Sequence, residues 1–124
     1  MLRVTMEQYE TAADCPFRDV LDHISGKWCF MVIAVLEDGP HRFNEIKRTV
    51  GDISQRVLTQ TLRELERDGF VKRTVVDDRP LKVVYELTGL GRSLIDPIKQ
   101  FVGWAADAHE EIKEARAAYD ERVG

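Results

Sequence analysis

The hydrophobic periodicity of this 124-residue chain changes at Gly69, and that change restricts the possible fold more than any other feature. Ahead of Gly69, apolar side chains recur at the three- and four-residue spacing of helices. Beyond it, residues 70–87 are rich in β-branched and aromatic side chains, which favour strands. Helical spacing returns from residue 90 onward. The sequence therefore predicts several short helices, a pair of strands and a closing helix.

Four short helices are predicted ahead of the strands. Pro16 suits a first helical position, Gly39-Pro40 ends the second helix, and Gly51 marks a turn. Ser54 is a favourable N-cap for the fourth helix, which we expect over residues 54–67. The apolar stripes expected to be buried are Phe17, Val20, Leu21 and Ile24; Trp28, Met31, Val32, Val35 and Leu36; Phe43, Ile46 and Val50; and Val57, Leu58, Leu62 and Leu65.

The two strands are expected to form a hairpin with a basic tip. They lie in residues 70–76 and 83–87, joined by the loop Asp77–Pro80. Thr88 is expected to cap the closing helix, which should bend or break near Pro97 because proline cannot complete the helical ladder. So long an apolar stripe on a terminal helix needs a partner, and we expect a homodimer. The residues expected at its interface are Leu94, Ile98, Phe101, Val102, Ala105 and Ile112.

The polar side of the fourth predicted helix has no carboxylate in its N-terminal half. Its acidic residues, Glu64, Glu66 and Asp68, occupy the final turns, where they are unfavourable to the helix dipole. This placement indicates that the N-terminal half is kept clear for an anionic partner. The charge distribution agrees, because residues 41–82 hold ten Lys or Arg against seven Asp or Glu, although the whole chain has a net charge of −4. An acidic protein can bind DNA through one basic face.

Short helices, a hairpin and a closing helix in this order predict a mainly α fold with a small β-hairpin, the winged helix-turn-helix. In that fold the second helix of the pair enters the major groove of double-stranded DNA, and the hairpin contacts the adjacent backbone or minor groove. Arg, Gln and hydroxyl side chains suit base edges and phosphates. The alternative is a merely solvated helix face, which any surface helix presents. The residues expected to contact DNA are Arg42, Ser54, Gln55, Arg56, Thr59, Gln60, Arg63, Arg79 and Lys82.

Short motifs distributed over residues 15–104 resemble the HxlR-type regulators. In this order they are Cys15-Pro16, Gly26-Lys27-Trp28, Gly39 with Arg42-Phe43, Leu58-Thr59 with Leu62-Arg63-Glu64-Leu65-Glu66, Asp68-Gly69, and Tyr85-Glu86-Leu87-Thr88 with Gly91. The chain departs from the family's proline-rich approach to the last motif, where it has the sequence from Arg79 to Tyr85.

The resemblance implies a homodimeric, MarR-like transcription factor, commonly a repressor, on a roughly palindromic operator. It implies a single domain over residues 1–124, with a DNA-binding core at about 16–88. Dimerisation would use the N-terminal segment and residues 89–120. Cytoplasmic location is expected, since the longest apolar run, Trp28–Leu36, is too short to span a membrane and residues 1–10 lack the core of a signal peptide.

Cys15 matches the position of the reactive thiol in those family members that sense electrophiles or oxidants. A cysteine at a helix N-terminus favours the nucleophilic thiolate, although Asp14 and Asp19 would oppose it. The alternative is a helix-start cysteine that senses nothing. Cys29 flanks an apolar stripe and is expected to be a buried, inert thiol.

Other functional classes find less support in the sequence. Two cysteines without metal-ligand spacing argue against a structural metal, and we expect no cofactor. No nucleophile elbow or phosphate-binding loop is present, and an enzyme built around Cys15 would lack an activating His or Arg arrangement. Two further hypotheses stay open: control by a small ligand at the dimer seam, and a winged helix that binds protein instead of DNA. We expect a non-enzymatic regulator.

Overall fold

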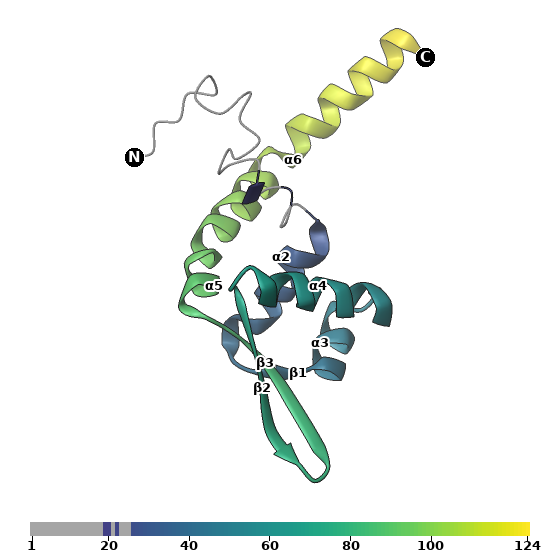
Figure 1. Ribbon diagram of the computed structural model, residues 1–124. Helices are drawn as coiled ribbons and strands as arrows, with labels where there is room; N and C mark the ends of the chain where they lie inside the picture. Colours follow the sequence, from purple (N-terminus) through teal and green to yellow (C-terminus); the bar gives the residue numbers. More distant parts are fainter. Residues whose placement is uncertain (1–18, 21, 23–25) are drawn as a thin grey trace. The chain divides into compact units, whose positions relative to one another are not determined.

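The computed structural model describes Asp19, Val20, Asp22 and residues 26–124 (Figure 1). Cys15 and the predicted helix start at Pro16 lie outside these residues. The chain divides after Arg92 into two compact units, which are described separately. None of the helices in the described part is long and apolar enough to cross a membrane.

Three helices form most of the first unit. They are α2 (Lys27–Val35), α3 (Phe43–Val50) and α4 (Gln55–Arg67), and a 3-10 turn, η2 (Leu36–Asp38), extends α2. Each contributes one buried face to a common apolar core. Its largest fully buried side chains are Val32, Ile33, Leu36, Ile46, Ile53, Leu58, Leu62 and Leu65.

Three predicted core positions are wrong among the described residues. Val20 is 44% exposed, Met31 is 39% exposed and Val57 is 37% exposed. The buried face of α2 instead includes Cys29 and Ile33, while Thr61 joins the leucines on the buried face of α4. In α2 the error is a rotation of about 100°, the angle between successive residues on a helix, whereas in α4 three of the four predicted positions are buried.

The turn between α3 and α4 has the predicted chemistry. Gly51 has a φ of 95°, which glycine adopts without steric strain. Ser54 is the N-cap of α4, and its Oγ accepts a hydrogen bond of 3.1 Å from the backbone N–H of Val57. The predicted boundaries of this helix, residues 54–67, agree with the structure.

An antiparallel sheet completes the first unit in the order β1-β3-β2. Its strands are β1 (His41–Arg42), β2 (Val71–Asp78) and β3 (Leu81–Leu87). The prediction missed β1, which pairs His41 with Tyr85. The hairpin of β2 and β3, called the wing below, is longer than predicted and projects beyond the helices (Figure 1). The fold is a winged helix-turn-helix.

The wing tip is not basic, contrary to expectation. Asp77 lies opposite Lys82 in the strand register, and its Oδ1 accepts a hydrogen bond from the backbone N–H of Arg79 at 3.2 Å. Asp78 adds a second carboxylate, so the two acidic and two basic side chains of the tip balance in formal charge. Any attraction of the tip to phosphate therefore depends on how Arg79 and Lys82 are presented.

The closing segment forms two helices, α5 (Gly89–Ser93) and α6 (Ile95–Val123). Thr88 caps α5 as predicted, since its Oγ1 accepts a hydrogen bond from the N–H of Gly91 at 3.1 Å. The break falls at Leu94, ahead of Pro97. Pro97 therefore lies in the first turn of α6. The backbone N–H groups of a first turn have no acceptor within the helix, so the N–H that proline lacks costs no helical hydrogen bond.

Candidate nucleic-acid interface

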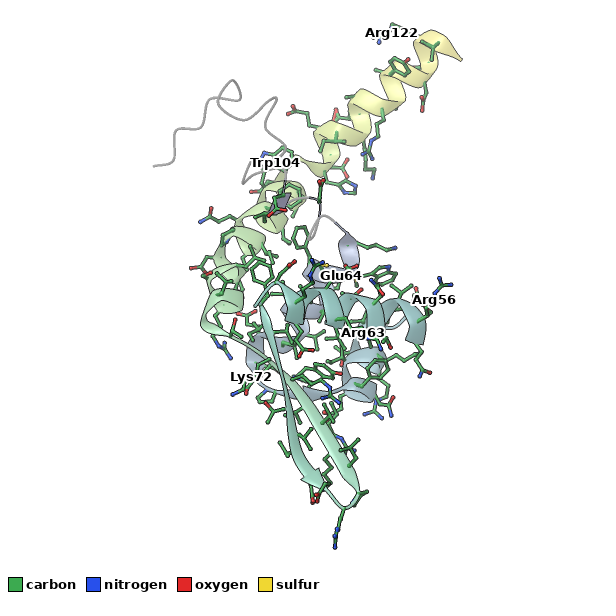
Figure 2. The ribbon with its side chains drawn as sticks, in the orientation of Figure 1. Arg56, Arg63, Glu64, Lys72, Trp104 and Arg122 are labelled. Carbon is green, nitrogen blue, oxygen red and sulfur yellow. The ribbon has the colours of Figure 1, made fainter. Side chains whose placement is uncertain are left out.

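The polar residues predicted to read DNA gather on one side of α4. Gln55, Arg56, Thr59, Gln60 and Arg63 line a single shallow hollow on the surface. Thr59 is half-buried and the other four side chains are exposed. Arg56 lies at the N-terminal end of the helix and Arg63 two turns further along (Figure 2). Two cations, two amides and a hydroxyl therefore line one hollow that can accept an anion, and the nearby carboxylate of Glu64 binds one of the amides, that of Gln60.

The N-terminus of α4 adds hydrogen-bond donors to this surface. Its first turn contains no acidic side chain, and the first backbone N–H groups of a helix have no partner within the helix. Ser54 accepts the bond from Val57, and its own hydroxyl proton remains to be donated. The Ser54 hydroxyl and the positive end of the α4 dipole would both stabilise a bound phosphate.

A second hollow lies where the start of α3 meets β3. It is lined by Arg42, which was predicted, and by Asn44 and Arg48, which were not. Glu45 also lines it, and its Oε1 accepts a 2.7 Å hydrogen bond from the backbone N–H of Arg42, which fixes the carboxylate at the start of α3. In helix-turn-helix proteins the first helix of the pair crosses the DNA backbone, and this rule could have identified Asn44 and Arg48 from the sequence.

The remaining predicted DNA contacts line neither hollow, although Leu81 and Val83, on either side of Lys82 in the sequence, line the second. Arg79 and Lys82 belong to the wing tip, which projects away from the helices (Figure 1). Both side chains are exposed. The structure thus groups the α4 residues, places Arg42 in a neighbouring hollow, and carries these two cations on the wing.

Of the two cysteines in the sequence, Cys29 is the one within the part of the chain that the structure describes, and it is 5% exposed. Burial, together with the nearby carboxylates of Glu64 and Asp68, raises the pKa of its thiol from 9.0 to about 11. Because the thiolate is the reactive form, this thiol is inert near neutral pH, as predicted.

The stripe predicted to form a dimer interface lies on the second unit, almost entirely on α6. No residue of this helix is buried, although it is 29 residues long and described throughout. Ile98, Ala105 and Ile112 are half-buried, whereas Phe101 and Val102 are each 59% exposed. The Phe101 ring stacks on Trp104, with centroids 6.1 Å apart.

Comparison with known proteins adds a family to this geometry. The family model described as HxlR-like helix-turn-helix matches residues 23–113. The HTH-type transcriptional regulator YtfH of Escherichia coli is 34% identical over 112 residues, which make up 90% of this chain and 86% of that protein. The matched region begins before α2 and ends within α6.

Two solved structures share the fold closely. The redox regulator HypR in its reduced form has a TM-score of 0.74 and 40% sequence identity, covering 80% of this chain and 98% of that chain. The reduced form of the transcriptional regulator YodB from Bacillus subtilis has a TM-score of 0.66 and 38% identity, covering 73% of this chain and 90% of that chain.

Proposed function

Because this chain belongs to the HxlR-like helix-turn-helix family of transcriptional regulators, we propose that it binds a palindromic DNA operator as a homodimer. In this proposal α4 enters the major groove and the wing lies against the adjacent backbone. Two-fold symmetry of the protein would be matched by two half-sites one helical turn apart, about 34–36 Å.

The observation that carries the proposal is the composition of the α4 surface. Arg56 and Arg63 offer bidentate donors of the kind that recognise guanine, and Gln55 and Gln60 offer the donor and acceptor pair that recognises adenine. A winged helix that binds protein would have no need to gather these side chains on one exposed surface of a helix whose first turn has no acidic residue. We therefore assign sequence readout to α4.

Contacts to phosphate would come from residues at α3 and on the wing. Arg42, Asn44 and Arg48 border one hollow, so they can contact one strand together. Arg79 and Lys82 on the wing would contact the backbone at a distance from α4. Such contacts position the protein and add affinity without sequence information.

The exposed stripe of α6 supports the dimer. Phe101 and Val102 would leave water when a second copy covers them, and burial of apolar surface stabilises association by roughly 25 cal/mol per Å² before the entropic cost of association. We propose repression as the mode of regulation, since a dimer bound over a promoter excludes the polymerase.

The two structural neighbours support a thiol signal, because HypR is named a redox regulator and YodB has been crystallised after diamide treatment. Of the two cysteines in this chain, Cys29 is buried and its pKa is raised. We propose that Cys15 reacts with an oxidant or small electrophile and that its modification lowers operator affinity. A response to ligand that survives Cys15→Ser would instead favour a ligand at the dimer seam.

Selection of binding sites from random double-stranded DNA tests the proposed function. Purified protein should enrich a two-fold symmetric sequence whose half-sites are centred about one helical turn apart. Failure to enrich any sequence at moderate salt, with the protein folded, would overturn the proposal. Enrichment of an asymmetric single site would overturn the dimeric operator while retaining DNA binding.

A further inference from the structure

We propose that Glu64 is a positioning residue for sequence readout, because it fixes the orientation of the Gln60 side-chain amide. This inference rests on the proposed function, in which α4 reads the major groove. It gives a specific role to a carboxylate near the C-terminal end of α4, where an acidic side chain is unfavourable to the helix dipole. Figure 2 marks Glu64 beside Arg63 on this helix.

The contact between the two side chains is direct. Nε2 of Gln60 donates a hydrogen bond to Oε1 of Glu64 at 2.9 Å, and both side chains are exposed. The residues are four apart in one helix, a spacing that places their side chains on the same face. Gln60 also lines the hollow shared with Arg56 and Arg63, so its amide borders the proposed reading surface.

The chemistry of the pair determines which end of the amide faces Glu64. An ionised carboxylate can only accept hydrogen bonds, so it binds the amide nitrogen and repels the amide oxygen. One amide hydrogen is then engaged by Glu64, and the second hydrogen and Oε1 remain for another partner. The amide therefore presents its donor and acceptor in one fixed order.

A fixed order matters because bases differ in the order of their groups. Adenine presents the N7 acceptor beside the N6 donor, which matches one N–H and one oxygen of a glutamine amide. Guanine presents two acceptors, N7 and O6, so its O6 would face the Oε1 of an amide held in this orientation. A mobile amide can turn to avoid that repulsion, whereas a fixed amide cannot. Glu64 should thus sharpen the preference for adenine at the base pair that Gln60 contacts.

The test measures base preference at one position of the selected operator. Gln60→Ala first identifies that base pair as the one whose preference it abolishes. The wild type, Glu64→Ala, Glu64→Gln and the control Glu66→Ala are then compared on duplexes that differ only at this base pair. Glu66 is two residues further along α4 and so does not share a face with Gln60 or Glu64, yet its removal changes the net charge equally.

We expect Glu64→Ala to reduce the adenine preference at this position by about twofold to tenfold, which lies between the effect of an exposed helix pair and that of a desolvated hydrogen bond to a charged group. Glu64→Gln should also lower the preference, because its amide can donate to Oε1 of Gln60 as readily as it accepts from Nε2 and so no longer fixes the orientation. Glu66→Ala should leave the preference unchanged. In a Gln60→Ala background, Glu64→Ala should have no further effect on it.

Three results would overturn this inference. The first is a wild-type preference in Glu64→Ala with unchanged melting temperature, and the second is an equal change in Glu64→Ala and Glu66→Ala. The third is an effect of Glu64→Ala that persists without the Gln60 amide. If Arg56→Ala still alters sequence preference in any of these cases, the proposed function stands and only the role of Glu64 fails. If the wild type selects no sequence, both fail together.

Discussion

Gly91 shows how a single residue fixes the packing of α5 against the ends of the wing strands. It is buried in α5, and a Cβ at this position would lie 2.1 Å from the carbonyl oxygen of Phe70 and 3.2 Å from the Cδ2 of Leu87. The backbone at Phe70 would have to shift to relieve this overlap. We expect Gly91→Ala to lower the free energy of unfolding by about 1–3 kcal/mol, as overpacking does, measured by urea denaturation.

Gly89→Ala is the matched control for this prediction. Gly89 is also in α5, and a Cβ there would meet no atom within 4 Å. Alanine should be neutral or stabilising at this position because it favours the helix. Equal destabilisation by the two substitutions would contradict the assigned role of the Phe70 contact.

Cys29 provides a prediction about reactivity at the residue scale. A rise in thiol pKa from 9.0 to about 11 lowers the thiolate fraction near neutral pH about 100-fold. In the Cys15→Ser variant, iodoacetamide should therefore modify the folded protein far more slowly than the protein unfolded in urea. The rate in the folded protein should rise with pH toward pH 11, since deprotonation is displaced to higher pH. Similar rates for folded and unfolded protein at neutral pH would contradict a buried, inert thiol.

At the scale of elements, α4 could be predicted from the sequence and α2 only in part. In α4 apolar residues recur at helical spacing among polar ones, and Ser54 marks the start of the helix. The bounds and the polar surface of α4 could therefore be predicted from the sequence. In α2 the nine-residue apolar run Trp28–Leu36 contains no polar residue to mark the outer face. The exposed position of Met31 is therefore set by tertiary packing, which a local pattern does not encode.

The pairing of β1 and the second hollow depend on contacts that are distant in sequence. β1 has two residues, too few to show a period, and its partner Tyr85 is 44 residues from His41. Arg48 borders the same hollow as Val83 only because the fold brings α3 to β3. The local pattern of the sequence therefore predicted the residues on α4, whereas the second hollow, formed by residues distant in sequence, was found only in the structure.

The α6 stripe gives a prediction about assembly. We expect the wild type to sediment as a dimer at micromolar concentration and Phe101→Glu to sediment as a monomer, because a buried unpaired charge at a dimer interface is strongly unfavourable. Gln100→Glu adds the same charge at an adjacent exposed position and should remain dimeric. A monomeric wild type, or a dimeric Phe101→Glu variant, would remove α6 from the proposed interface.

At the scale of the whole molecule, the proposed signal acts through the spacing of two α4 helices. They must lie about 34–36 Å apart to occupy successive major grooves, so a change of a few ångströms would leave one of them poorly docked. We expect diamide to lower operator affinity steeply in the wild type, through a disulfide or a small-thiol adduct at Cys15, and a reductant to restore it. Operator titrations of wild type and Cys15→Ser, before and after treatment, measure this. Equal responses in the two proteins, or none in either, would contradict sensing through Cys15.

The most direct test of the central claim, that α4 reads DNA sequence, is the ratio of affinities for the selected operator and for random DNA at one fixed salt concentration. The account predicts that Arg56→Ala lowers this ratio, with a loss of about 1–3 kcal/mol on the operator and less on random DNA. Arg79→Ala on the wing should weaken both DNAs alike and reduce the salt slope by about one, leaving the ratio as in the wild type. An unchanged ratio in Arg56→Ala, with operator affinity also unchanged, would contradict the placement of α4 in the major groove.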